Sequence, residues 1–473
     1  MMQLSSAMVG FIMQRKWRVA LIVCVGVLMS SLDLFIVNIA FPAIGKHFAG
    51  ASLASLSWIL TAYAVVFAAL LVPAGRWADA FGRKRVFLLG LAIFVAASTA
   101  CALAPSVAAL TLARIVQAAG GALMLPTSLG LMLPEFAPQE RHVAIGAWAA
   151  TGGIAAAAGP PIGGLLVQAD WRLVFLVNVP VGLLGLGFGL RTLRERSEPN
   201  ARRPDVLGAL ALALGIGGLV VAIVKGHDWG WDSPQIIALA SLSALALPAV
   251  WRRSAHHEAP VFEPAILRVR SFALALAGSV LFFLAFGAML LSGVLFLTSV
   301  WHESVLNAGL MLFPGPATAT AFTVPSARLG ARVGFRAPGI AGAVLLAAGS
   351  LWYITHAGAR PDYAADFLPG LLIGGAGVGL LIPTLTGAGA SSLPEQRFAT
   401  GAALLTTGRQ VGAALGVAVL VAVLAPHAHS ASEFHSAWLI TVVAALAAGL
   451  TVGAIGPARR RQALPDALLP GAA

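Results

Sequence analysis

The chain has 473 residues, of which 59% are hydrophobic and only 10% are charged. A soluble domain has about 25% charged residues and a core that stops growing near about 250–300 residues, so this composition excludes an ordinary soluble protein, and disordered, collagen-like and disulfide-stapled chains as well. The net charge of +12 would suggest a nucleic-acid partner in a soluble protein, but here the basic residues lie between apolar runs, where membrane topology explains them better.

Apolar runs long enough to cross a bilayer recur along the whole chain. A spanning helix needs about 20 apolar residues because the hydrocarbon core is about 30 Å thick. Such runs, bounded by charged or turn residues, lie at 18–41, 54–74, 86–104, 108–133, 142–167, 173–191, 205–224, 235–251, 272–300, 305–325, 337–355, 366–390, 398–424 and 437–456. The sequence therefore predicts an all-α integral membrane protein with fourteen transmembrane helices, the first of which is an uncleaved helix and not a signal peptide.

Arginine and lysine test this count, because they accumulate on the cytoplasmic side of a membrane protein. If the N-terminus is cytoplasmic, only four of them fall outside: Lys46, Arg172, Lys225 and Arg360. Two more lie within the runs, Arg114 and Arg409, and all the others are cytoplasmic. We therefore expect a multi-pass membrane protein with both termini in the cytoplasm. The low lysine content and the abundance of alanine, glycine and arginine favour a bacterial source, and hence the bacterial inner membrane.

Two longer basic connections divide the predicted helices unevenly. They separate an N-terminal six-helix bundle (1–191), a linker with two additional transmembrane helices (192–271), and a C-terminal six-helix bundle with a cytoplasmic tail (272–473).

The first cytoplasmic connection reads GRWADAFGRKR. Gly75 and Gly82 permit a close helix approach and a tight turn, while Asp79 can cap a neighbouring helix N-terminus or pair with an arginine. Arg83 belongs to the same candidate loop. The basic residues could equally act as topology determinants only. The run resembles the G-x-L-a-D-r-x-G-r-r loop of the major facilitator superfamily, and this resemblance implies a gating loop.

Four further runs occur in the order found in one branch of that superfamily. They are LDLFIVNIAFP at 32–42, RIVQAAGGA at 114–122, AAAAGPPIGG at 155–164 and TGRQVGAALG at 407–416. Each is similar to a motif of the fourteen-helix drug/proton antiporter branch, of multidrug efflux type. The resemblance implies a major facilitator fold, with two six-helix bundles around a central cavity and, in this branch, two inserted helices.

The third of these runs resembles a fifth-helix motif associated with exporters. Its residues are Gly159, Pro160, Gly163 and Gly164. Pro160 removes a backbone hydrogen bond and is expected to kink its helix, which is useful where one half rocks against the other. The glycines could equally form a small-residue packing face between membrane helices.

Ionisable residues within the runs indicate function, because a charge at the bilayer centre costs at least about 2.5–3.5 kcal/mol unless it is paired or hydrated. Asp33 is the only acidic residue well inside a run, so it is the first candidate to carry a proton. The resemblance implies a part in proton transfer for Arg114. The alternative is a permanent ion pair between Asp33 and Arg114 that fixes the helix packing.

Polar residues elsewhere in the runs are candidates for the substrate cavity. They are Asn38, Tyr63, Gln117, Arg409 and Gln410. Asn38, Tyr63 and Gln410 could each instead satisfy a backbone carbonyl. Arg409 either lines the cavity or binds the loop that carries Asp79.

Enzyme motifs are missing from the sequence. It has no G-x-S-x-G elbow, no metalloprotease histidine pair and no phosphate loop, and His427 and His429 lack a third metal ligand. We therefore expect no enzymatic activity, no cofactor and no metal site.

The sequence favours proton-coupled export of hydrophobic or amphiphilic small molecules, such as drugs, dyes or antibiotics, by alternating access. A proton-coupled uptake symporter for a small metabolite and a non-transporting membrane sensor or scaffold are the alternatives. The expected partners are a small-molecule substrate, protons and the lipid bilayer, without nucleic acid, and a monomer is the expected state.

Overall fold

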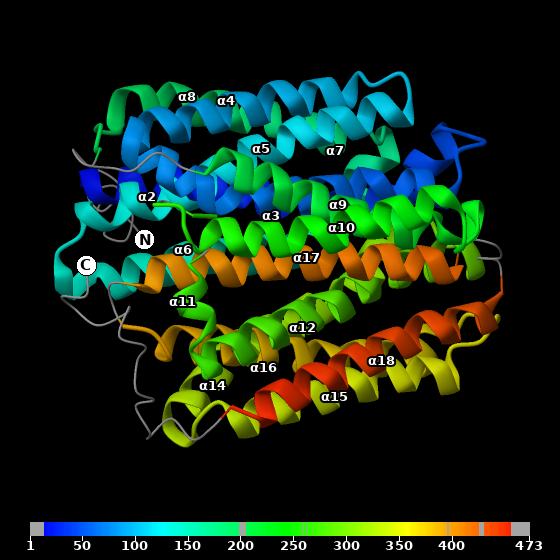
Figure 1. Ribbon diagram of the computed structural model, residues 1–473. Helices are drawn as coiled ribbons and strands as arrows, with labels where there is room; N and C mark the ends of the chain where they lie inside the picture. Colours follow the sequence, from blue (N-terminus) through cyan, green and yellow to red (C-terminus); the bar gives the residue numbers. More distant parts are fainter. Residues whose placement is uncertain are drawn as a thin grey trace, which may run out of the picture.

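The computed structural model describes residues 14–197, 205–258, 260–261, 263–394, 397–424 and 430–455. These residues form long helices joined by short connections, and no β-strand occurs among them. Figure 1 shows the helices lengthwise in two stacked groups, one blue to green and the other green to red, with orange α17 where the groups meet. The all-α membrane architecture expected from the apolar runs is confirmed.

The first group, which we call the N-terminal half, contains six elements of membrane-spanning length. They are α2 (Arg15–His47), α3 (Leu53–Phe81), α4 (Arg83–Ala102), α5 (Val107–Met132), α6 (Arg141–Ala169) and a sixth that is divided into α7 (Leu173–Leu176) and α8 (Asn178–Thr192). The hydroxyl groups of Ser52 and Ser106 accept hydrogen bonds from backbone N–H groups in the first turns of α3 and α5. Serine caps of this kind start helices because they satisfy donors that have no intrahelical partner.

A helical hairpin follows, made of α9 (Val206–Trp229) and α10 (Pro234–Ser254), and a short helix, α11 (Pro264–Leu267), leads into the second group. This second group is the C-terminal half. It contains α12 (Arg270–Leu295), α13 (Val305–Leu312), α14 (Pro314–Val333), α15 (Arg336–His356), α16 (Leu368–Ser391), α17 (Phe398–Leu424) and α18 (Ala431–Gly453).

Thirteen of the described helical segments are long and apolar enough to cross a membrane, against fourteen expected runs. The difference lies at 305–325, which forms two helices, α13 and α14, on either side of Phe313. Pro314 has no N–H group to donate and therefore fits the first turn of a new helix, where this donor is not needed. The tenth expected crossing is thus interrupted near its middle.

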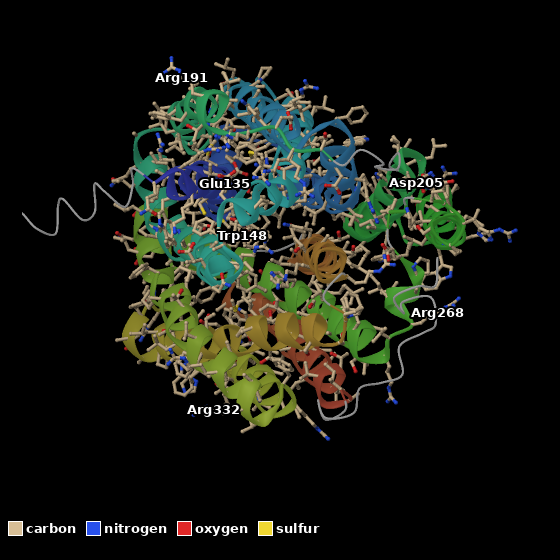
Figure 2. All side chains as sticks on the ribbon, turned by 90° about the vertical axis from the view of Figure 1, so that its left-hand side faces the viewer. Glu135, Trp148, Arg191, Asp205, Arg268 and Arg332 are labelled. Carbon is tan, nitrogen blue, oxygen red and sulfur yellow. The ribbon has the colours of Figure 1, made fainter. Side chains whose placement is uncertain are left out.

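The two ends of the molecule differ in how the halves pack. Figure 2 views the end at which α2 begins and labels Arg191, Arg268 and Arg332 there, and we call it the arginine-rich end. At the opposite end, one apolar cluster contains residues of both halves, such as Ile44 and Leu295. Toward the arginine-rich end each half has a cluster of its own. The halves therefore share an apolar cluster at the opposite end, whereas toward the arginine-rich end each half packs around its own cluster.

One line of contact between the halves runs between α3 and α17. The Thr407 hydroxyl in α17 donates a hydrogen bond to the Ala68 carbonyl oxygen in α3, at 3.3 Å. The inserted helix α9 packs against both α3 and α17, so it covers this seam from the side. The domain boundaries at 191 and 271 stay predictions.

Candidate functional site

The most enclosed charges in the described part of the chain form an ion pair inside the N-terminal half. Arg114 in α5 donates from Nη1 to the carboxylate of Asp33 in α2, and both side chains are fully buried. The Arg114 Nε atom donates to the Ile59 carbonyl oxygen of α3 at 3.1 Å. One guanidinium group therefore joins three helices, and the carboxylate neutralises its charge.

Gln117 extends this pair into a polar network. Its Oε1 atom accepts from Arg114 Nη1 at 2.6 Å, and its Nε2 atom donates to Asp33 Oδ1 at 2.9 Å. The same Nε2 atom donates to the Ser98 hydroxyl in α4 at 2.8 Å, which also accepts from Asn178 in α8 at 3.5 Å. Ser98 and Asn178 were not assigned to the site from sequence, although each is a polar residue within an apolar run.

Aromatic rings cover the guanidinium group. The Arg114 guanidinium carbon lies 4.1 Å from the centre of the Tyr63 ring and 5.9 Å from that of Phe175. Such contacts stabilise a desolvated cation. The Tyr63 hydroxyl and Arg114 Nη2 are buried without a hydrogen-bond partner among the described residues. The site thus holds one spare donor and one spare hydroxyl group next to the carboxylate.

The five residues expected in the substrate cavity divide into two groups. Tyr63 and Gln117 are buried at the ion pair, inside the N-terminal half. Asn38 donates to the Leu34 carbonyl oxygen of its own helix at 2.7 Å, the backbone alternative considered above. Gln410 lies in α17 and is partly exposed.

Arg409, the fifth, belongs to the C-terminal half and not to the loop that carries Asp79. It lies in α17 and donates from Nη2 to the Thr386 hydroxyl of α16. Its guanidinium carbon lies 5.5 Å from the centre of the Phe283 ring in α12. The structure thus places Arg409 between three helices of one half.

The predicted gating loop forms the turn between α3 and α4. Arg83 donates to Asp79 at 2.9 Å and to the Gly130 carbonyl oxygen of α5 at 3.2 Å. Asp79 therefore pairs with an arginine and does not cap α4. That cap comes from Glu195, beyond α8, whose carboxylate accepts from the backbone N–H groups of Lys84 and Arg85 at 3.1 and 3.2 Å. Nothing in the sequence near Asp79 indicated this partner.

The two glycines of the loop have different reasons to be there. Gly82 has a φ of 104°, and a side chain added to it would overlap the Glu195 carboxylate. A Cβ added to Gly75 would meet nothing nearer than the Pro126 Cβ atom at 3.6 Å, which is an ordinary contact. The tight turn expected at Gly82 is present, but the expectation that Gly75 permits a close helix approach is wrong, because there is room for a methyl group.

The glycines of the exporter-type motif lie where α6 contacts α2 of its own half and α13 of the C-terminal half. A Cβ added to Gly159 would lie 2.5 Å from the Phe35 Cβ atom of α2, and one added to Gly163 would lie 3.3 Å from the Ile36 Cα atom. A Cβ added to Gly164 would lie 2.8 Å from the Cα atom of Leu306 in α13, across the interface between the halves. The packing role that was the alternative reading of this motif is therefore visible in the contacts.

No group of three potential metal ligands occurs among the residues that the structure describes. His427 and His429 lie outside these residues.

The Major Facilitator Superfamily model matches residues 23–417. The chain is 35% identical over 415 residues to the "Multidrug resistance protein Stp" of Mycobacterium tuberculosis (strain CDC 1551 / Oshkosh), covering 87% of this chain and 76% of that protein. It is 36% identical over 420 residues to the "Puromycin resistance protein pur8" of Streptomyces alboniger, covering 86% and 81%. The "Tetracenomycin C resistance and export protein" of Streptomyces glaucescens is 34% identical over 413 residues, covering 87% and 76%.

Solved structures show the same fold at low sequence identity. A POT family transporter in complex with 5-aminolevulinic acid has a TM-score of 0.68 at 14% identity, covering 92% of this chain and 96% of that one. The chain is a multi-pass membrane transporter and not an enzyme, its relatives are drug and antibiotic resistance proteins, and it belongs to the Major Facilitator Superfamily.

Proposed function

We propose that this protein exports hydrophobic or amphiphilic small molecules from the bacterial cytoplasm in exchange for protons, by alternating access. The names of its relatives support export of drugs and antibiotics. The observation that carries proton coupling is the fully buried pair of Asp33 and Arg114, because an intramembrane carboxylate is costly to retain without a function.

Protonation of Asp33 would change which helices are held together. Removing one partner of a buried ion pair costs about 3–5 kcal/mol, because the other charge stays behind without compensation. A neutral Asp33 would leave Arg114 tied to Ile59 in α3 and to Gln117 in its own helix, and no longer to a charge in α2. Proton uptake would therefore loosen α2 from α3 and α5.

This loosening would act on the contacts between the halves. α2 packs against α12 and α13, and α3 packs against α17, so both helices contact the C-terminal half. We propose that the shared cluster at the opposite end separates when Asp33 takes up a proton from outside, and that the substrate leaves there. Loading would occur at the arginine-rich end, where each half packs around its own apolar cluster.

The arginine-rich end would face the cytoplasm of a bacterial inner membrane, in accord with the accumulation of basic residues on that side of membrane proteins. Both termini would then be cytoplasmic. We propose a monomer, made of the two six-helix bundles and the inserted pair, as the transporting unit.

Dye efflux from cells tests the proposal. Cells of an efflux-deficient bacterial host are preloaded with the neutral dye phenylnaphthylamine and energised with or without a protonophore. They express the wild type, Asp33→Asn, Asp205→Asn or an empty vector. Asp205 is the matched control, because it is also buried and paired with an arginine, Arg253 at 2.6 Å, but lies at the start of the inserted hairpin.

We expect protonophore-sensitive efflux from the wild type and from Asp205→Asn, and efflux at the vector rate from Asp33→Asn at equal membrane abundance. Efflux from Asp33→Asn at the wild-type rate would contradict the role of Asp33. A wild type no faster than the vector would contradict broad export. Proton-driven dye accumulation by the cells would identify an uptake symporter, and dye binding without movement a sensor or scaffold.

A further inference from the structure

Arg409 is a cation deep in the C-terminal half with no acidic partner in the described part of the chain. It lies about 17 Å along α17 from the start of that helix, close to its middle. Its guanidinium group has one hydrogen bond, to the Thr386 hydroxyl, and its Nε atom is buried without any. Arg114, by contrast, has a carboxylate, a carbonyl oxygen and an amide as partners.

The neighbours of Arg409 define the direction in which its side chain points. Thr407 faces α3 of the other half, and Gly412 packs directly on the Val280 carbonyl oxygen of α12. Arg409 reaches past Phe283 of α12 to Thr386 of α16. α12 and α17 are also helices that pack against α2 and α3. The Arg409 side chain therefore points from α17 across α12 toward α16, and the residue as a whole is partly exposed.

The balance of charge leaves this group uncompensated. Asp33 is already neutralised by Arg114, so it is not available to Arg409. An isolated charge inside the membrane costs at least about 2.5–3.5 kcal/mol, and intramembrane charges of this kind mark ligand pathways. A ligand that brings a negative charge would remove this cost during binding.

The aromatic rings beside Arg409 favour a ligand that also has an apolar part. Phe283 and Phe286 are both half-buried on α12, and their ring centres lie 5.7 Å apart in an edge-to-face arrangement. Rings that are partly exposed next to a cation offer an apolar surface to the body of a ligand whose acidic group binds the cation.

We propose that Arg409, with Phe283 beside it, is an anion-binding subsite, and that the preferred substrates are amphiphiles with an acidic group such as a carboxylate or sulfonate. This inference rests on the proposed function. Arg409 donates from Nε and Nη atoms to the acidic oxygens, and Phe283 packs against the adjoining apolar part of the molecule. A simple lipophilic cation is disfavoured by the same guanidinium group.

Binding of two dyes to the purified full-length protein tests this subsite. Anilinonaphthalene sulfonate and phenylnaphthylamine share the same ring system and differ by the sulfonate group, and the fluorescence of both rises on binding, so protein-free micelles give the background. The variants are Arg409→Gln, Arg409→Lys and the control Arg360→Gln, which removes an arginine charge from an exposed connection.

We expect the wild type to bind the sulfonate more tightly than the neutral dye. Arg409→Gln lowers affinity for the sulfonate about 10- to 100-fold, the effect of losing a hydrogen bond to a charged group, and leaves affinity for the neutral dye unchanged. Arg409→Lys retains part of the affinity because it keeps the charge. Arg360→Gln binds both dyes as the wild type does.

Equal loss of affinity for both dyes in Arg409→Gln would show a merely structural arginine and overturn the proposal. So would a wild type without preference for the sulfonate, or one that binds neither dye. Neutral-dye efflux that depends on Asp33, together with any of these binding results, would leave the proposed function standing and remove only the anion subsite.

Discussion

Gly309 of α13 lies directly against the carbonyl oxygen of Pro160 in α6, one residue from each half of the molecule. A side chain on Gly309 would collide with this backbone atom, and a backbone contact cannot be relieved by a change of rotamer. The opposite end can therefore close only while this position has no side chain.

Gly309→Val is expected to favour the conformation in which the opposite end is open. The measurement is the rate at which an impermeant maleimide labels Leu306→Cys, a position next to Gly164, in a chain whose Cys24 and Cys101 are replaced by alanine. We expect faster labelling in the Gly309→Val background. The matched control is Gly152→Val in α6, where an added Cβ meets nothing within 4 Å. Equal labelling rates in the two backgrounds would contradict a closing contact at Gly309.

Glu263, just before α11, accepts from Arg76 of α3 at 3.2 Å and from Arg397, just before α17, at 2.5 Å. One carboxylate thus ties the two halves together on the side of the α3 and α17 seam. Glu263→Gln is expected to lower the melting temperature of the purified protein, because two arginines lose their shared partner.

Salt distinguishes this ionic effect from a change in packing. Screening weakens partly exposed ion pairs, so the difference between the wild type and Glu263→Gln should shrink as the salt concentration rises. Glu303→Gln is the control, since its carboxylate accepts from the Asn307 amide and pairs with no charged group among the described residues. A difference that persists at high salt would point to packing instead.

Gly82→Ala and Gly75→Ala form a matched pair within one loop. Gly82 has a positive φ and lies against Glu195, so alanine there is expected to destabilise the protein by about 1–3 kcal/mol through backbone strain. Alanine at Gly75 has room and should leave the melting temperature unchanged or slightly raised. Equal melting temperatures for both variants would show that the turn adjusts at no cost.

Glu140 supplies a pH-dependent contribution to stability near the start of α6. The hydrogen bond from Lys16, at 2.7 Å, holds the pKa of the Glu140 carboxyl below its ordinary value. A carboxyl whose pKa is lowered by folding stabilises the fold above its unfolded pKa, and this stabilisation is lost as the pH falls through the lowered pKa. The wild type should therefore melt above Glu140→Gln at neutral pH, and the two melting curves should converge in acid. A difference that grows on acidification would contradict the Lys16 contact.

The sequence predicted the helices and the central pair better than their surroundings. Apolar length alone locates membrane helices, and the cost of an unpaired charge makes Arg114 the natural partner of Asp33. Tyr63 and Gln117 were assigned to the cavity, because periodicity gives the face of a helix and not the neighbour that this face meets. Glu195 is even less predictable, since its contacts to α4 depend on how the chain returns after α8.

The helix α9 covers the seam between α3 and α17, whereas among the described residues neither α9 nor α10 packs along the seam of α6 with α13 and α14. The two flanks of the molecule therefore differ in the number of helices that separate the interface between the halves from the surrounding lipid. A compound dissolved in the membrane meets an added wall on one flank and only the two halves themselves on the other. A compound that enters sideways from the bilayer would therefore have to pass the inserted pair on the α3 and α17 flank, but not on the α6 flank.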